Sequence, residues 1–138
     1  MTSTLVDSNV VLDVLDADQG WGEWSARKIA EAGDSGRVII NPIIFAEVSI
    51  SFMYFAEFDL LISSINLARE PLPWEAAFEA GRAHQLYRRR SGMRDRTLPD
   101  FFIGAHAAVE GYRLLTRDPR CYRTYFPTVQ LIAPDTHP

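Results

Sequence analysis

Short, continuously apolar runs alternate with longer segments of helical spacing along this chain. The runs are too short for helices, and they lack the polar alternation of a strand that is exposed on one face. Strands that are apolar on both sides indicate a parallel sheet with helices on both faces. The pattern therefore predicts an α/β fold with a central, mostly parallel sheet of about five strands. The predicted strands are Thr4–Val6, Arg37–Asn41, Glu70–Leu72, Arg113–Thr116 and Val129–Ile132.

The segments between the strands carry apolar residues at helical spacing, often between a cap residue and a glycine. No internal repeat, low-complexity tract or linker interrupts them. A chain of 138 residues can bury one core and is too short for two domains. We therefore expect a single domain over residues 1–138. The predicted helices are Asn9–Leu15, Trp24–Ala32, Ile43–Phe55, Phe58–Leu67, Glu75–Arg90 and Pro99–Glu110.

Four acidic residues lie inside apolar segments or directly after them: Asp7, Glu47, Asp100 and Asp118. Asp7 and Asp118 follow predicted strands, at the sheet edge where α/β folds bind ligands. Two unit charges 4 Å apart repel by about 4 kcal/mol at an effective dielectric near 20. Four converging carboxylates would therefore need a divalent cation or bound protons. If the four converge, they form a metal site.

Three of these acids have a simpler explanation. Asp7, Asp100 and Asp118 stand near predicted helix starts, where an aspartate can cap free N–H groups. Glu47 lies about one turn into a strongly apolar helix, and no lysine or arginine occurs between Arg37 and Arg69. A buried carboxylate needs a partner or a metal. Glu47 therefore favours the functional interpretation of the whole set.

The net charge of −4 hides an uneven distribution. Residues 1–79 carry 13 acids and 4 bases, whereas residues 80–138 carry 5 acids and 10 bases. An acidic pocket beside a basic segment suits a polyanion that arginines hold while metal ions act on it. A solvated, arginine-rich helix surface explains the same charge pattern, so charge alone leaves both interpretations open.

The rest of the composition indicates a soluble cytoplasmic protein. The single cysteine, Cys121, excludes an internal disulfide and fits a reducing compartment. The first fifteen residues lack a basic n-region and carry Asp7 and Asp13, so they do not resemble a signal peptide. Glu47 and Glu57 interrupt the most apolar stretch, and we expect no membrane span.

Four motifs in order resemble the PIN-domain nucleases, and specifically the VapC-type toxins of bacterial toxin–antitoxin pairs. Each motif carries one of the four acids, and the match spans essentially the whole chain. The resemblance implies a PIN-like three-layer α/β/α fold and RNA cleavage that depends on Mg²⁺ or Mn²⁺. It also implies a cognate VapB-type antitoxin and a homodimer. The motifs are Leu5–Leu12, Phe45–Val48, Leu98–Ala107, and Leu114–Arg120 followed by Tyr122–Pro127.

The resemblance also assigns roles to the acids. Asp7 and Asp100 are expected to be the principal ligands of a first metal, and Asp118 to assist directly or through water. Glu47 is expected to ligate a second metal or to orient the attacking water. Carboxylate oxygens select hard cations such as Mg²⁺ and Mn²⁺. The three histidines lack the spacing to the cysteine that a zinc site requires.

Further candidates surround the acids. Thr116 is expected to position the nucleophile or a ligand, and Asn9 to hold Asp7 or the phosphate. Basic residues just before Asp100 are candidates for contacts with RNA phosphates or with an antitoxin tail. These are Arg88, Arg89, Arg90, Arg94 and Arg96.

Two other functions compete with a nuclease. A non-catalytic RNA-binding or protein-interaction module would use the acids only as caps, which leaves Glu47 unexplained. A phosphoryl-transfer receiver domain needs an adjacent acid pair and a late lysine, but Lys28 is the only lysine and lies in an early predicted helix.

Aromatic residues exceed what one small core needs, so we expect some to serve an antitoxin helix or a dimer contact. They are Trp21, Trp24, Phe52, Tyr54, Phe55 and Phe58, with Met53 among them.

Overall fold

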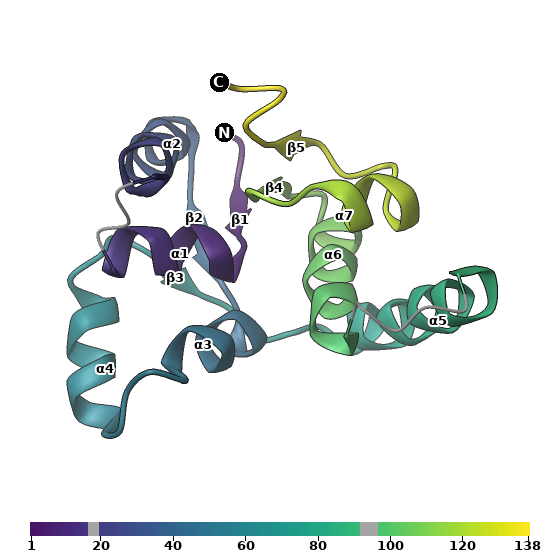
Figure 1. Cartoon of the computed structure of the whole chain (residues 1–138), viewed down its shortest axis with the longest axis horizontal. Helices are drawn as coiled ribbons and strands as arrows, with labels where there is room; N and C mark the ends of the chain where they lie inside the picture. Colours follow the sequence, from purple (N-terminus) through teal and green to yellow (C-terminus); the bar gives the residue numbers. More distant parts are fainter. Residues whose placement is uncertain (17–19, 92–96) are drawn as a thin grey trace.

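The computed structural model describes residues 1–16, 20–91 and 97–138 (Figure 1). Within these ranges the chain forms five strands in one sheet and seven helices that alternate with them. All neighbouring strands are parallel, and their spatial order is β3-β2-β1-β4-β5. The predicted α/β fold and its parallel sheet are confirmed. The strands are β1 (Thr4–Val6), β2 (Val38–Ile40), β3 (Ala68–Arg69), β4 (Arg113–Leu115) and β5 (Leu131–Ile132).

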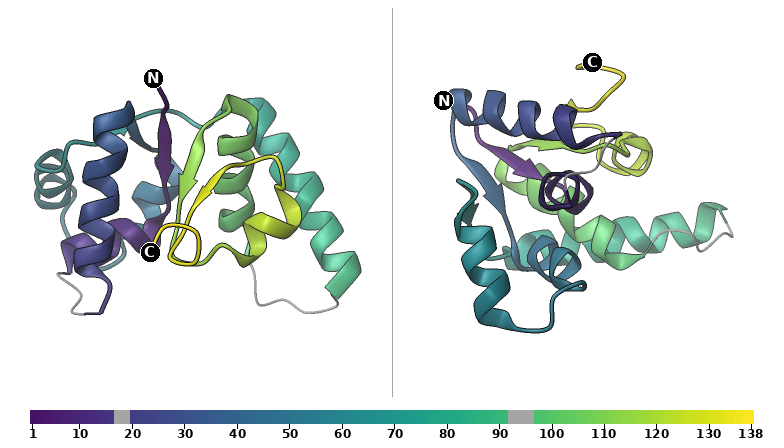
Figure 2. Two further views of the ribbon diagram at one scale, coloured as in Figure 1. Left: turned by 90° about the horizontal axis from the view of Figure 1, so that it is seen from above. Right: turned by 60° about the vertical axis from the view of Figure 1, so that its left-hand side comes forward.

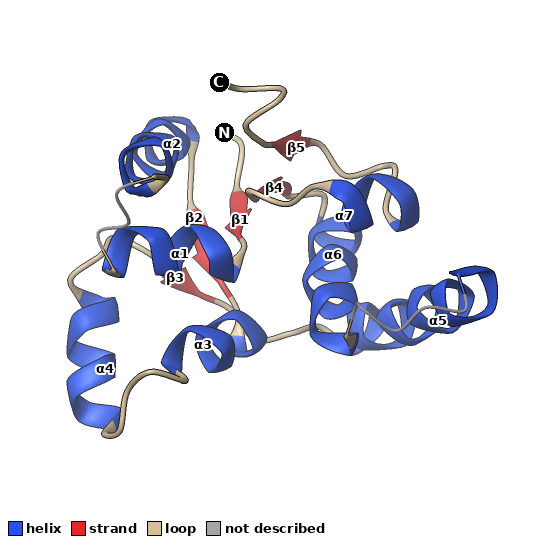
Figure 3. Ribbon diagram, viewed as in Figure 1, coloured by secondary structure: helices blue, strands red, loops and turns tan. Residues whose placement is uncertain are grey.

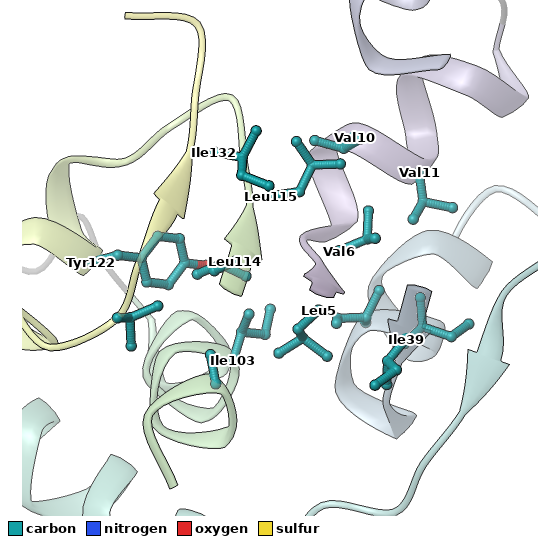
Figure 4. Packing of buried hydrophobic residues seen from close by; sticks show 14 of the residues in the cluster. Leu5, Val6, Val10, Val11, Ile39, Ile103, Leu114, Leu115, Tyr122 and Ile132 are labelled. Carbon is teal, nitrogen blue, oxygen red and sulfur yellow. The ribbon is translucent and has the colours of Figure 1, made fainter. Parts of the chain in front are cut away.

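The central strand β1 is the point at which the strand order reverses. The chain passes from β1 outward to β2 and β3 and then returns to place β4 and β5 on the other side of β1. Leu5 of β1 is level with Ile39 of β2 and Leu114 of β4, and all three side chains are fully buried (Figure 4). A parallel sheet binds ligands at such a reversal, beyond the carboxyl ends of its strands. Asp7 and Thr116 follow β1 and β4 at this place.

The helices cover both faces of the sheet, as the apolar strands require. In Figure 2, α2 lies on one side of the strands, and α5 and α6 lie on the other. Figure 3 shows the helices in blue and the strands in red. Helix α3 packs against both α1 and α6. Across the described ranges, no helix has both the length and the apolar composition needed to cross a membrane. The helices are α1 (Ser8–Leu15), α2 (Gly22–Ser35), α3 (Pro42–Ser49), α4 (Phe55–Ser63), α5 (Trp74–Ser91), α6 (Leu98–Glu110) and α7 (Arg120–Tyr125).

Two helices that flank the site begin and end on clear local signals. The Asn41 side chain caps α3 by accepting a hydrogen bond from the Ile44 N–H at 2.9 Å, and Pro42 follows at the first helical position. Pro99 lies in the first turn of α6, and Gly111 ends that helix in the left-handed conformation with φ 70°. These signals fix where α3 and α6 present their side chains to the sheet edge.

The predicted helix Ile43–Phe55 was wrong in its second half. Helix α3 ends at Ser49, and the next helix begins at Phe55. The Phe52 N–H donates to the Ser49 carbonyl at 2.9 Å, which turns the chain back. Phe52 then packs on Phe58 at 4.8 Å between ring centroids, and this aromatic contact replaces the helical continuation.

The third strand also differs from its predicted position. It covers Ala68–Arg69 rather than Glu70–Leu72, although the Glu70 N–H still donates to the Ile40 carbonyl at 3.0 Å. Pro71 has no N–H to continue the ladder. The strand therefore lies at the sheet edge and stops early.

Candidate metal centre

Asp7 occupies the centre of the candidate site, directly after β1. Its side chain is 4% exposed, and its N–H donates to the Leu115 carbonyl of β4 at 2.9 Å. The residue is also the N-cap of α1, because its Oδ1 accepts from the Ser8 N–H at 2.8 Å. The capping interpretation and the central position are therefore both correct for this residue.

The other carboxylate oxygen of Asp7 is held by two hydroxyl groups. Thr116 Oγ1 donates to Asp7 Oδ2 at 2.8 Å, and the Tyr122 hydroxyl donates to the same atom at 2.9 Å. Asn9 Nδ2 lies 3.5 Å from Oδ2 and 3.4 Å from Thr116 Oγ1. The Asp118 N–H donates to Thr116 Oγ1 at 3.1 Å. Thr116 therefore links Asp7 to the segment after β4, and both Thr116 and Asn9 contact Asp7, while their roles in catalysis stay a prediction.

Tyr122 was missing from the sequence prediction. It lies in the short helix α7, is buried, and reaches back to Asp7 across 115 positions of sequence. No local pattern distinguishes it from Tyr125, because the direction of each side chain depends on how α7 packs against the sheet. Only the tertiary structure assigns it to the site.

The environment of Asp7 favours its protonated form. Burial raises the pKa of Asp7 above its ordinary value of 3.8, and the negative charge of Asp100 raises it further. The hydrogen bonds from Thr116, Tyr122 and Ser8 lower this pKa but do not reverse the shift. A neighbouring cation would offset the unfavourable burial of the Asp7 charge and its repulsion by Asp100.

Glu47 projects from α3 toward the same place. Its side chain is half-buried, and its Oε1 atom is buried without a hydrogen-bond partner within the described residues. Burial raises the pKa of Glu47, a hydrogen bond from Ser8 lowers it, and the charges of Asp7 and Asp100 raise it. Asp7, Glu47 and Asp100 are therefore close enough to form one electrostatic cluster.

Asp100 belongs to the first turn of α6 but does not cap it. The N-cap of α6 is Thr97, whose carbonyl accepts from the Asp100 N–H at 3.2 Å. Asp100 is therefore not the N-cap residue of α6. Its charge raises the pKa of Asp7, of Glu47 and of Tyr122, so Asp100 lies within electrostatic range of all three.

Asp118 stands at the margin of this cluster. Its carboxylate pairs with Arg120, at 3.0 Å to Nε and 3.3 Å to Nη2. The N-cap position of α7 belongs to Pro119, so Asp118 is not the capping residue either. The structure thus groups three of the four acids by charge and joins Asp118 to them through the backbone contact with Thr116.

An ion pair between the half-exposed Arg117 and the buried Asp13 supports the segment after β4. The Arg117 guanidinium donates to both oxygens of Asp13 at 2.5 and 2.9 Å, and Ser25 donates to Asp13 Oδ2 at 2.7 Å. The Arg117 N–H donates to Asn9 Oδ1 at 3.2 Å. The pair joins residues 104 positions apart, so sequence spacing gives no signal for it. It fixes Asn9 and the chain that carries Thr116.

The donor set fits a hard divalent cation. Within residues 1–16, 20–91 and 97–138, no three acid, histidine or cysteine side chains already surround a single point at metal-binding distance. The carboxylates nevertheless share one charge cluster, and Glu47 Oε1 has no donor. Oxygen ligands of this kind are those that Mg²⁺ and Mn²⁺ prefer.

The basic residues before Asp100 divide into two groups. Arg88, Arg89 and Arg90 are exposed in the last turn of α5. Arg94 and Arg96 lie outside the described residues. The role of the arginines in RNA or antitoxin binding stays a prediction.

Comparisons with known proteins place this geometry in context. The sequence profile of the PIN domain matches residues 4–127. VapBC2 from Rickettsia felis, bound to promoter DNA, is similar in structure with a TM-score of 0.72 at 15% identity, over 96% of this chain and 98% of that chain. VapBC-1 from nontypeable Haemophilus influenzae has a TM-score of 0.71 at 14% identity, over 96% of this chain and 98% of that chain. VapC20 from Mycobacterium tuberculosis, a toxin that cleaves the sarcin–ricin loop, has a TM-score of 0.62 at 13% identity, over 92% of this chain and 98% of that chain. No curated protein matches the sequence.

Proposed function

Because the chain belongs to the PIN-domain family, we propose that it is an endoribonuclease that depends on Mg²⁺ or Mn²⁺. The observation that carries the proposal is the charge cluster of Asp7, Glu47 and Asp100 at the reversal of the strand order. Burial and mutual repulsion raise the pKa of both Asp7 and Glu47, so the folded chain holds negative charge at an energetic cost. A site that binds a divalent cation offsets this cost.

The residues that would hold the ion are Asp7 and Asp100 first, with Glu47 supplying its orphaned oxygen and Asp118 assisting. When bound, the ion lowers the pKa of a water and stabilises the leaving oxygen in attack on an RNA phosphodiester. In this proposal Glu47 orients that water or binds a second ion. Hydrolysis consumes one water for each phosphodiester bond that is cleaved, and it needs no reactant besides the RNA and water.

The surrounding polar residues keep Asp7 in one orientation. Thr116 and Tyr122 both donate to its Oδ2, which leaves Oδ1 on the side of Ser8. Two hydroxyl donors also favour the charged form that a cation requires. Thr116 additionally binds the Asp118 N–H, so it holds both strand-end acids in register.

We further propose that the chain is the toxin of a toxin–antitoxin pair. The support is structural likeness to VapBC complexes from several bacteria. The surface that suits a VapB-type antitoxin is apolar and lies between α3 and α4. It includes Phe55, which is 70% exposed, and it borders a hollow of about 380 Å³ lined in part by Phe45 and Phe55. The homodimer stays a prediction.

The test is cleavage of a labelled single-stranded RNA by the purified protein, with Mg²⁺, Mn²⁺ or a chelator. Wild-type protein should cleave with either cation and not with the chelator. Asp100→Asn keeps the side-chain shape and removes the charge, so it should fold normally and lose cleavage. The matched control is Asp34→Asn on the exposed part of α2, which should cleave like wild type. Cation-dependent cleavage by Asp100→Asn at the wild-type rate would overturn the assignment.

A further inference from the structure

Helix α5 presents an aromatic and basic stripe to solvent, directly opposite its buried face. Ala76, Ala80 and Tyr87 form the buried face, and α5 packs there against α6. At 100° per residue, the opposite direction carries a different set of side chains. We call this set the α5 stripe: Trp74, Phe78, Arg82, Gln85 and Arg89.

The fold itself makes little use of the aromatic members. Trp74 is 91% exposed and Phe78 is 61% exposed, although these residue types normally bury much of their surface. The Arg82 guanidinium lies 5.1 Å from the centroid of the Phe78 ring, which is cation–π distance. Exposed aromatic rings beside arginines are the composition of a surface that stacks bases and binds phosphates.

The stripe borders a hollow with a polar and basic lining. Its volume is about 400 Å³, and Gly81, Arg82, Gln85, Arg88 and Arg89 contribute to its wall. Gly81 lies in mid-helix, where glycine costs about 1 kcal/mol relative to alanine. Nothing lies within 4 Å of the position of a Cβ on Gly81, so packing inside this chain does not require the glycine. The missing side chain instead keeps the surface beside Arg82 open.

The α5 stripe contains no acidic residue. Glu75 and Glu79 are the only acids in α5, and at helical spacing they fall on its flank rather than along its outward line. Among the described residues, no ion pair neutralises Arg82, Arg88 or Arg89. The basic end of α5 also lies on the same side of the molecule as the carboxyl ends of the strands (Figure 2, left). A strand of RNA on the stripe could therefore lead toward the acid cluster.

We propose that the α5 stripe binds single-stranded RNA, with bases stacked on Trp74 and Phe78 and phosphates paired with Arg82 and Arg89. The proposal rests on RNA being the substrate, and it adds where the part of the RNA outside the acid cluster is held. Stacking on aromatic rings tolerates any base, so the stripe supplies affinity rather than sequence selection.

A second copy of the chain fits the stripe less well. At a rise of 1.5 Å per residue the stripe is about 22 Å long, and a helix is about 10 Å wide. It therefore covers on the order of 200 Å², against about 800 Å² per partner in a stable dimer. A single RNA strand needs only a narrow track of rings and positive charges.

The test measures binding of a fluorescein-labelled single-stranded RNA of twenty nucleotides, in chelator, over a range of salt concentrations. Trp74→Ala and Phe78→Ala should each weaken binding by about 5- to 150-fold with an unchanged salt slope, as expected for a lost stacking contact. Arg89→Ala should reduce the slope of log K against log salt by about 0.7. The matched controls are Leu60→Ala on α4 and Arg27→Ala on α2, both exposed. Neither control should change binding.

Each outcome decides the proposal separately from the enzyme assignment. Equal RNA affinity in the three stripe variants and in wild type would overturn the stripe, even if the protein cleaves RNA. Loss of binding in the stripe variants would support it, even if the cleavage test above fails. Sedimentation of Trp74→Ala gives a further check, because a change from dimer to monomer with intact RNA binding would identify a self-interface and contradict the proposal.

Discussion

The replacement of Glu47 by glutamine should change stability in opposite directions with and without a divalent cation. Glu47 Oε1 is buried without a hydrogen bond, and its charge repels those of Asp7 and Asp100. Glutamine keeps a polar atom at this position but removes the charge, so the variant relieves the burial of that charge and its repulsion by Asp7 and Asp100. Because the Glu47 side chain is only half-buried, solvent screens part of this effect, and the gain is on the order of 1 kcal/mol. In chelator, Glu47→Gln should therefore be more stable than wild type by about 1 kcal/mol, or about 4 °C in Tm.

The cation should reverse this order. An ion present at one hundred times its Kd stabilises a folded protein by about 2.7 kcal/mol, or roughly 10 °C in a domain of this size. Glu47→Gln loses a charged ligand and should keep less than half of that shift. Wild type should thus melt below the variant in chelator and above it in excess Mg²⁺.

Thermal melts of both proteins in chelator and in a Mg²⁺ series measure the two effects together. Glu79→Gln on the exposed surface of α5 is the matched control and should behave like wild type in both conditions. A Glu47→Gln variant that is less stable than wild type in chelator, and that keeps the full Mg²⁺ shift, would refute the reasoning. That result would return Glu47 to a structural role.

Three further predictions follow from the same structure. The raised pKa values of Asp7 and Glu47 mean that the cation-free folded protein retains protons that the unfolded chain releases above their ordinary values of 3.8 and 4.5. Their contribution to stability should therefore be present at low pH and be lost as pH rises through the raised pKa values. The unfolding free energy of Asp7→Asn in urea, relative to that of wild type, should therefore increase with pH. A relative stability that falls with pH would contradict this. Tyr122→Phe removes a donor from Asp7 Oδ2 and should lower the unfolding free energy by about 1–2 kcal/mol in urea titrations, whereas an unchanged midpoint would mean that the hydroxyl is dispensable. Gly81→Ala should raise the unfolding free energy by about 1 kcal/mol, since the added methyl group meets nothing, and a loss of stability would show an unrecognised constraint at this position.

The fold was predictable because its strongest signals are local. The apolar runs around Leu5, Ile39 and Leu114 are buried on both faces, and that property is visible as an absence of polar alternation. The boundaries after Ser49 and at Ala68 were not predictable in the same way. The first depends on Phe52 packing against Phe58, and the second on strand pairing at the sheet edge.

The acids of the site were also visible in the sequence, but their partners were not. Asp7 and Glu47 stand out because an acid in an apolar segment needs a reason. Tyr122 and the pair of Asp13 with Arg117 give no such signal, since tyrosine, aspartate and arginine are ordinary in half-exposed helices. Their roles depend on contacts that span more than 100 residues. For Asp118 the sequence and the structure give different partners. Its motif predicts a metal ligand, whereas its carboxylate pairs with Arg120 in the structure.

The central claim is that the buried Asp7 after β1 and the half-buried Asp100 in the first turn of α6 share a divalent cation. Titration with Mn²⁺, followed by the electron paramagnetic resonance signal of the free ion, measures this directly and does not require a known RNA. Wild-type protein should remove free Mn²⁺ saturably. Asp7→Asn and Asp100→Asn, checked for folding by circular dichroism, should lose that binding, while Asp34→Asn should retain it. Mn²⁺ binding by folded Asp7→Asn and Asp100→Asn equal to that of wild type, or no binding by wild type at millimolar Mn²⁺, would contradict the claim.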